Sequence, residues 1–295
     1  MYPLSERVIG RREAALRWQE TQTEYIGQRL VPAARALANS ARGLPWSVRK
    51  ARMLAQAIRF SAPIVHEDEL LVGYNFSGGD GQQWLEMTGF RAHGGDRERL
   101  AAYLSQGSLT PEQIDEALSI LENVDGPGVE PGSVPEPEPL ATIAPAEGLY
   151  WCQATAYNHT VVGYARVLEL GFLGLAAEVR DRLAALDPAD EQDRRARTVL
   201  EGMLTVAEAA AEIGERYADH VHALRAACPD PRRAGELAAL EAVLRQVPAR
   251  PARTFYEALQ SLWFAHILNT WEDGINANSL GRLDQILYPY YRRDL

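Results

Sequence analysis

The side chains of this sequence that could carry out nucleophilic, acid–base or metal chemistry are few and lie far apart. The two cysteines, Cys152 and Cys228, form neither a disulfide framework nor a metal-binding pair, and we interpret both as structural thiols. His220 and His222 are two residues apart on a predicted helix, so they face different sides and do not make a metal pair. Spacing alone therefore predicts no catalytic centre and no metal site.

The remaining polar motifs are equally sparse. The run from His66 to Glu69 resembles the start of an HExxH zinc motif, but position 70 is leucine, so we interpret the run as a solvated acidic turn. His266 falls on the apolar face of a predicted helix, where we interpret it as a core residue with satisfied polar atoms. The sequence contains no G-x-S-x-G elbow and no phosphate-binding G-x-x-x-x-G-K-[ST] loop.

The composition excludes several classes of partner. A formal net charge of −10 and a pI near 5.2 argue against a nucleic-acid-binding protein, which presents a basic surface. No apolar run approaches the roughly 20 residues that span a membrane, and the first residues lack the apolar segment of a secretory signal. We therefore expect a cytoplasmic protein with neither a nucleic-acid nor a membrane partner.

Helical periodicity dominates the elements that must position these side chains, so the predicted fold class is mainly α with a few strands. Two helix starts carry a capping box, in which a threonine caps the first turn and Gln or Glu three residues later reaches back. These boxes are Thr110 with Gln113 and Thr254 with Glu257. Further helices are predicted over residues 5–41 with a break at Pro32, and over residues 47–60, 163–186, 189–227 and 234–246.

Strand and linker signals are confined to short segments. Residues 70–74 and 275–280 are predicted strands. Residues 125–147 contain six prolines among glycines and glutamates, so they form neither a helix interior nor a central strand. This predicts a helical region over residues 1–124 with a short strand near 70–74, a linker over 125–147, and a second helical region over 148–295.

Four separated stretches resemble the pyruvate formate-lyase-like glycyl radical enzymes, in the order in which that family has them. The most specific is SLGRLDQ at residues 279–285 followed by YPYYRRD at residues 288–294. The other three are residues 23–25 with 49–51 and 68–73, residues 158–164 with the helix that follows, and residues 247–260. The family resemblance implies that residues 148–295 lead into the first part of a ten-stranded α/β barrel, which this chain leaves incomplete.

The resemblance also implies a chemistry. In this family an activating enzyme, which uses S-adenosylmethionine and an iron–sulfur cluster, removes a hydrogen atom from a backbone glycine. The radical passes to a cysteine, whose thiyl attacks the substrate. Neither cysteine of this sequence stands in such a loop and the radical-glycine motif is absent, so we expect no catalytic residue, no bound cofactor and no activity in this chain alone. The parent would be an anaerobic lyase or dehydratase that cleaves C–O, C–N, C–C or C–S bonds of a small polar substrate.

Residues that match the family motifs supply the candidate site. By resemblance, His159, Asn276, Asn278 and Ser279 would face the substrate of the full enzyme. Their alternative roles are structural: capping a helix or filling a strand end. The family often has Gly at position 158 and Pro-Asp at positions 162 and 163, where this chain has Asn, Val and Gly, and these departures leave the substrate class open.

Two further residues of the SLGRLDQ stretch have an expected structural role. Arg282 and Asp284 are two residues apart, which on an extended segment places them on the same face. We expect them to form an ion pair that supports the barrel.

The expected partners depend on what the chain is. As a fragment, it belongs to a longer enzyme whose partners would be an activase and a small-molecule substrate. A homodimer of that enzyme is a further option. As half of a split enzyme, it needs a second chain that carries the two missing loops. As a degenerate relative, it is a non-catalytic binding or scaffold protein.

Overall fold

The computed structural model describes residues 6–21, 27–40, 44–73, 97–122, 162–273 and 279–295. Their secondary structure is helical, and the only β-type assignment within these ranges is an isolated bridge at Ser279. The helices are α1 (Glu6–Thr21), α2 (Leu30–Ala38), α3 (Trp46–Phe60), α5 (Arg97–Leu104), α6 (Pro111–Glu122), α8 (Tyr164–Ala184), α9 (Glu191–Ala227), α10 (Pro231–Gln246), α11 (Phe255–Asp273) and α12 (Leu283–Asp294).

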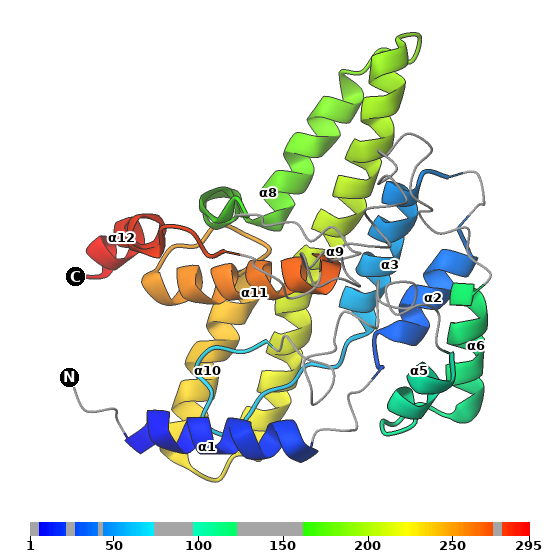
Figure 1. Ribbon diagram of the computed structural model, residues 1–295. Helices are drawn as coiled ribbons and strands as arrows, with labels where there is room; N and C mark the ends of the chain where they lie inside the picture. The colour runs from blue at the N-terminus through cyan, green and yellow to red at the C-terminus, as the bar shows by residue number, and fades with distance from the viewer. Residues whose placement is uncertain (1–5, 22–26, 41–43, 74–96, 123–161, 274–278) are drawn as a thin grey trace, which may run out of the picture.

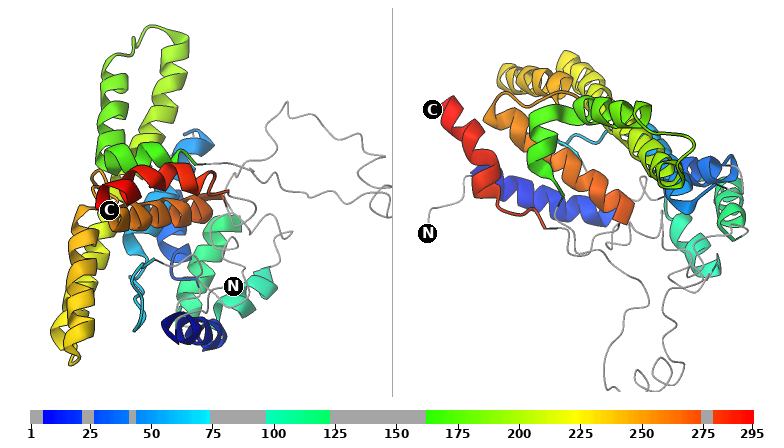
Figure 2. Two further views of the ribbon diagram at one scale, coloured as in Figure 1. Left: turned by 90° about the vertical axis from the view of Figure 1, so that its left-hand side faces the viewer. Right: turned by 90° about the horizontal axis from the view of Figure 1, so that it is seen from above.

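The long helix α9 organises the fold, because α3, α8 and α10 all pack along it. Figure 1 shows α8 and the first part of α9 as a hairpin that projects from the body, while α10 runs back beside the second half of α9. The left view of Figure 2 shows the same projection, and both views place α12 beside α11. No described helix has the length and apolar character needed to cross a bilayer.

Three apolar clusters hold the helices together. The largest joins α2 and α3 to α9, α10 and α11 through residues such as Leu37, Ile58, Ile213, Leu240 and Phe264. It therefore unites helices from both sides of the 125–147 segment, which itself lies outside the described residues. A second cluster packs α2 against α5 and α6, and a third joins α8, the end of α10, α11 and α12.

The predicted helices are confirmed with small shifts of their ends, but the position of Pro32 differs from expectation. Pro32 was the expected break in a helix over 5–41, whereas it lies in the first turn of α2, where its missing N–H has no intrahelical partner to lose. Pro289 lies inside α12, which begins at Leu283. The boundary between the first two helices falls instead before Leu30.

The predicted strand at residues 70–74 is wrong over residues 70–73, where no strand is assigned. The side chains of α11 take the place of a neighbouring strand. Gln260 bonds both backbone groups of Val72, with its amide oxygen 2.9 Å from the Val72 nitrogen and its amide nitrogen 2.7 Å from the carbonyl oxygen. Trp263 donates to the Gly73 carbonyl at 3.0 Å. Since side chains of α11 form hydrogen bonds with these backbone N–H and carbonyl groups, the segment needs no neighbouring strand.

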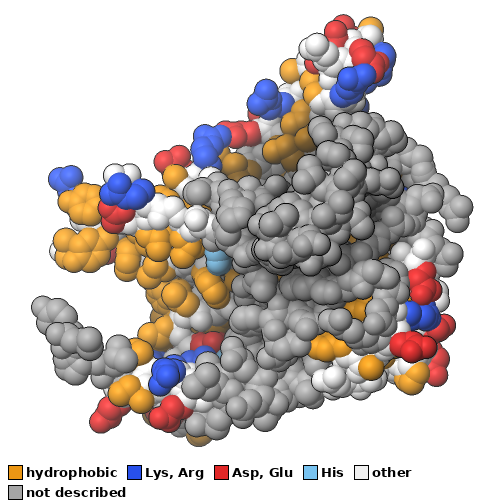
Figure 3. All heavy atoms as spheres, viewed as in Figure 1, with side chains coloured by type: hydrophobic (Ala, Val, Ile, Leu, Met, Phe, Trp, Pro, Cys, Tyr) orange, Lys and Arg blue, Asp and Glu red, His pale blue; other side chains and the backbone are white. Residues whose placement is uncertain are grey.

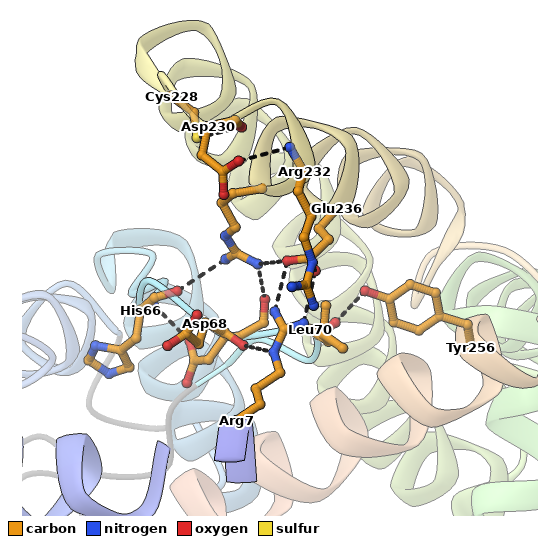
Figure 4. Close-up of polar contacts among 11 residues, drawn as sticks. Arg7, His66, Asp68, Leu70, Cys228, Asp230, Arg232, Glu236 and Tyr256 are labelled. Carbon is orange, nitrogen blue, oxygen red and sulfur yellow. Dashed lines mark hydrogen bonds and ion pairs between the residues drawn. The ribbon is translucent and has the colours of Figure 1, made fainter. Parts of the chain in front are cut away.

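Tyr256 extends the same row of helix side chains and donates to the Leu70 carbonyl, as the right-hand part of Figure 4 shows. Tyr256, Gln260 and Trp263 follow one another at spacings of four and three residues, so they lie on one face of α11. This row fixes residues 70–73 along α11.

A glycine kink in α8 fits the helix to the segment that connects α10 with α11. Gly171 has φ +66°, and a Cβ added there would lie 2.4 Å from the Ala249 carbonyl oxygen. Beside it, the Phe172 nitrogen donates to the Pro248 carbonyl at 2.9 Å, and the Ala252 nitrogen donates to the Leu168 carbonyl at 2.9 Å. Only glycine allows both this backbone conformation and this close approach.

Candidate functional site at the contact of α8 and α11

The start of α11 is fixed by the predicted capping box. The Thr254 hydroxyl accepts from the Glu257 backbone nitrogen at 3.2 Å, and the Glu257 carboxylate accepts from the Arg253 backbone nitrogen at 2.7 Å. The end of α12 closes over the same turn, because Asp294 accepts from the Phe255 nitrogen at 2.7 Å. Helix α11 is therefore held at its first turn as well as along the face that binds residues 70–73.

On an adjoining face, α11 meets the first residue of α8 through a polar contact. The Tyr164 hydroxyl lies 2.9 Å from His266 Nδ1, and the Tyr164 side chain is fully buried while His266 is half-buried. Burial raises the pKa of Tyr164 to about 12 and lowers the pKa of His266 below its ordinary value. Trp263 packs beside the imidazole with a ring-centroid distance of 5.8 Å. The contact thus brings together a neutral phenol and a neutral imidazole.

Chain segments with the predicted substrate-facing residues adjoin this contact in sequence. His159 precedes Tyr164 by five residues, while Asn276 and Asn278 follow the last residue of α11 by three and five. All three lie outside the described residues, and Ser279 is described and exposed. Their substrate-binding role stays a prediction.

Arg282 and Asp284 form an exposed, bidentate ion pair with N–O distances of 3.0 and 2.8 Å. The pair is made at a helix start and not on the extended segment we expected, because Arg282 is the residue before α12 and Asp284 lies in its first turn. The hydrogen bond from Arg282 lowers the pKa of Asp284. Whether the pair supports a barrel stays a prediction.

Apolar side chains gather on the outer side of this region. Figure 3 shows them over α11 and α12. The exposed hydrophobic residues of α12 include Tyr288 and Tyr291, and Leu295 after it is 87% exposed. A contiguous exposed apolar patch is typical of a surface that another element covers.

A separate hollow of about 520 Å³, lined by both charged and apolar side chains, lies between α1, residues 65–68 and the turn that joins α9 to α10. Figure 4 shows Arg7 reaching from α1 to Glu236 on α10. Both terminal nitrogens of Arg7 lie 2.8 Å from the Glu236 carboxylate oxygens, and the Arg7 Nε donates to the Asp68 carbonyl at 3.2 Å. Arg233 adds hydrogen bonds to the Glu69 and His66 carbonyls.

The charged side chains Arg7, Arg233 and Glu236 of this hollow are therefore paired with one another. The hydrogen bond from Arg7 lowers the pKa of Glu236 to about 2, against the opposing effect of burial. Glu69 was expected on a solvated turn, but it is largely buried, its pKa is raised by burial, and it pairs with Arg11 at 2.8 Å. The ion pair between Arg7 and Glu236 thus connects α1 to α10. Within the described ranges, no group of three or more acidic, Cys or His side chains could hold a metal ion.

His266 is the site residue whose importance the sequence did not reveal. Its apolar neighbours on α11 predicted a satisfied core histidine, which the Tyr164 contact confirms for Nδ1 only. The partner lies 102 residues away in the sequence, so no local pattern could have found it.

Comparison with known proteins identifies the family. The pyruvate formate lyase-like family matches residues 11–295. The isethionate sulfite-lyase of Bilophila wadsworthia is 40% identical over 136 residues, which cover 45% of this chain and 16% of that protein. The corresponding protein of Desulfovibrio desulfuricans is 29% identical over 270 residues, covering 85% of this chain and 32% of that protein.

Solved structures agree on the fold. The trans-4-hydroxy-L-proline dehydratase of Clostridioides difficile superposes with a TM-score of 0.73 at 23% identity, over 99% of this chain and 37% of the dehydratase. A glycyl radical enzyme from Archaeoglobus fulgidus gives a TM-score of 0.68 at 21% identity, over 96% of this chain and 37% of that enzyme. The chain belongs to the pyruvate formate lyase-like glycyl radical enzymes, in their dehydratase and lyase branch. It spans about a third of the length of these relatives.

Proposed function

We propose that this chain forms the N-terminal part of a glycyl radical lyase or dehydratase and supplies one wall of its catalytic barrel. The observation that carries the proposal is the similarity to the Desulfovibrio desulfuricans isethionate sulfite-lyase, which runs through 270 residues and so includes both helical regions. The apolar side chains exposed on α12 support it, because the remaining part of a barrel would cover them.

The proposed substrate is a small hydroxylated molecule in which the carbon next to the one with the leaving group carries a hydroxyl or an amine nitrogen. The related proteins are named for isethionate, which loses sulfite, and for trans-4-hydroxy-L-proline, which is dehydrated. When the neighbouring carbon carries a hydroxyl, as in isethionate, HO–CHR–CHR′–X becomes the carbonyl compound O=CR–CH₂R′ and HX. In trans-4-hydroxy-L-proline the neighbouring carbon carries the ring nitrogen, so loss of water would give a cyclic imine and H₂O. The atoms balance, and no external oxidant or reductant is consumed. X would leave as sulfite in a C–S lyase and as water in a dehydratase.

The radical groups of such an enzyme would be supplied from outside this chain. A partner activase would install the glycyl radical, and the radical-bearing loops would come from the rest of the barrel, in the same polypeptide or in a second one. A non-catalytic scaffold is the alternative function. The cytoplasmic, anaerobic setting remains part of this proposal.

Product analysis tests the function. The chain is combined anaerobically with the activase and with a polypeptide that supplies the rest of the barrel, and it is offered isethionate, 1,2-propanediol and trans-4-hydroxy-L-proline separately. We expect release of sulfite or loss of water from at least one substrate, dependent on all three proteins. A reconstituted, radical-bearing complex that turns over none of these hydroxylated substrates would contradict the proposed reaction class.

A further inference from the structure

The contact between Tyr164 and His266 determines which imidazole nitrogen carries the proton. The Tyr164 hydroxyl is fully buried, and within the described residues its hydrogen-bond partner is His266 Nδ1 at 2.9 Å. If Nδ1 carried the proton, the hydroxyl hydrogen would be buried without an acceptor among the described residues, which is unfavourable. The hydroxyl therefore donates, Nδ1 accepts, and the proton of the neutral imidazole resides on Nε2.

The environment keeps this imidazole neutral. Burial is the cause of its lowered pKa, with no contribution from a charged side chain. On the Tyr164 side, burial holds the phenol protonated, with a pKa of about 12. The pair therefore stays in one protonation state near neutral pH, and His266 presents a single N–H donor of fixed position.

Two donors on this side of α11 have no acceptor among the described residues. One is the Nε2–H of His266, because the hydrogen bond of this side chain is the one made at Nδ1. The other is the Nδ2 of Asn269, a buried atom without a hydrogen-bond partner. Asn269 follows His266 by three residues, so the two side chains are neighbours on one face of the helix.

We propose that His266 and Asn269 are substrate-binding residues, which donate hydrogen bonds to an oxygen of a small hydroxylated anion such as a sulfonate or carboxylate. This inference rests on the proposed function and extends it to residues that no family motif assigned. Two adjacent N–H donors match an acceptor-rich group and do not match an ammonium group, which has only donors. An oxygen ligand would also satisfy the buried Nδ2 of Asn269, whose burial is otherwise unfavourable.

A pair of matched variants separates binding from structure. In His266→Asn, the shorter side chain offers an oxygen to Tyr164 near the Nδ1 position but places no donor near the Nε2 position. In His266→Gln, the longer side chain can offer both an acceptor to Tyr164 and an amide donor near Nε2. A purely structural role predicts that both variants resemble the wild type or fail together, whereas a binding role separates them.

The test is nuclear magnetic resonance of the 295-residue chain titrated with 2-hydroxyethanesulfonate. We expect ¹⁵N shifts that place the His266 proton on Nε2, and a saturable shift of the Asn269 side-chain amide in the wild type and in His266→Gln. In His266→Asn we expect roughly tenfold weaker binding, the typical loss of one good hydrogen bond. Tetramethylammonium at equal ionic strength is the control probe and should leave Asn269 unshifted.

Three results would overturn the inference. They are ¹⁵N shifts that place the His266 proton on Nδ1, an Asn269 side-chain amide whose shift does not change on addition of the sulfonate, and equal affinity of His266→Asn and the wild type for the sulfonate. None of these measurements requires a radical. If the sulfonate binds as expected but the reconstituted complex forms no product, the reaction class is wrong while the donor pair stands. If product forms without these shifts, the donor pair is wrong and the reaction class stands.

Discussion

Gln260 and Val72 are joined by two hydrogen bonds of 2.9 and 2.7 Å, although 188 residues separate them in the sequence. Both residues are fully buried. The glutamine side chain thus pairs both backbone groups of Val72 as a neighbouring strand would.

Replacing Gln260 with leucine should therefore be costly. Gln260→Leu leaves the Val72 N–H and carbonyl buried and unpaired, and we expect it to lower the free energy of unfolding by about 2–4 kcal/mol. The matched control is Gln192→Leu on the exposed tip of α9, where the change should stay within about 0.5 kcal/mol. Urea denaturation measures both, and equal effects of the two variants would show that the Val72 contact carries no stability.

The kink of α8 makes a second prediction. Gly171→Ala forces a Cβ to within 2.4 Å of the Ala249 carbonyl oxygen at a φ of +66°, so we expect a loss of more than about 2 kcal/mol in the free energy of unfolding. Gly235→Ala, inside α10 with open space around its Cβ, should stabilise the fold by up to about 1 kcal/mol. Thermal unfolding distinguishes them. Similar melting temperatures for the two variants would contradict the described kink.

The ion pair between Arg7 and Glu236 predicts that the contact of α1 with α10 is weakened by acid. The folded pKa of Glu236, about 2, lies below the ordinary carboxyl value of 4.5. Its stabilising contribution is therefore present above pH 4.5 and lost as the pH falls toward 2. Glu236→Gln should lower the free energy of unfolding by about 1 kcal/mol at pH 7, and wild type and variant should converge near pH 2.

Hydrogen exchange locates this effect. In Glu236→Gln the amides of α1 should exchange faster at pH 7 than in the wild type, since Arg7 loses its charged partner. Glu67→Gln, on the exposed part of the neighbouring loop, is the control and should leave α1 unchanged. Equal protection of α1 in all three proteins would show that Arg7 and Glu236 do not hold the helix.

His266 predicts the pH dependence of stability in the neutral range. Its folded pKa lies below the ordinary 6.5, so the stability that depends on the neutral imidazole is present above pH 6.5 and is lost as the pH falls below that value. The difference in unfolding free energy between wild type and His266→Gln should shift in favour of the variant below pH 6.5. Comparing the two proteins cancels the titration of the other histidines. A pH-independent difference would contradict the buried, neutral imidazole.

The sequence predicted those features that neighbouring residues determine. Thr254 and Glu257 define the start of α11 within one helical turn, and the structure confirms it. The strand at residues 70–74 was predicted wrongly because its hydrogen-bond partners are side chains of α11, far away in the sequence. Glu69 was placed on the surface for a similar reason, since Arg11 and Arg233, which approach it, come from other elements.

In the candidate site, too, local motifs and contacts between distant residues gave different information. Family motifs pointed to His159, Asn276 and Asn278, which lie outside the described residues and stay predictions. The contact of His266 with Tyr164 joins two helices that no periodic pattern relates. Residue motifs thus identified the family, while the hydrogen-bond donors of α11 emerged only from the packing.

Electron paramagnetic resonance tests the central claim most directly. The chain is incubated anaerobically with a family activase, S-adenosylmethionine and a reductant, once alone and once with a polypeptide that supplies the rest of the barrel. We predict a glycyl radical doublet only in the second sample, with co-elution of the two polypeptides. A doublet from this chain alone, or a supplied barrel that activates equally well without associating with this chain, would contradict the account.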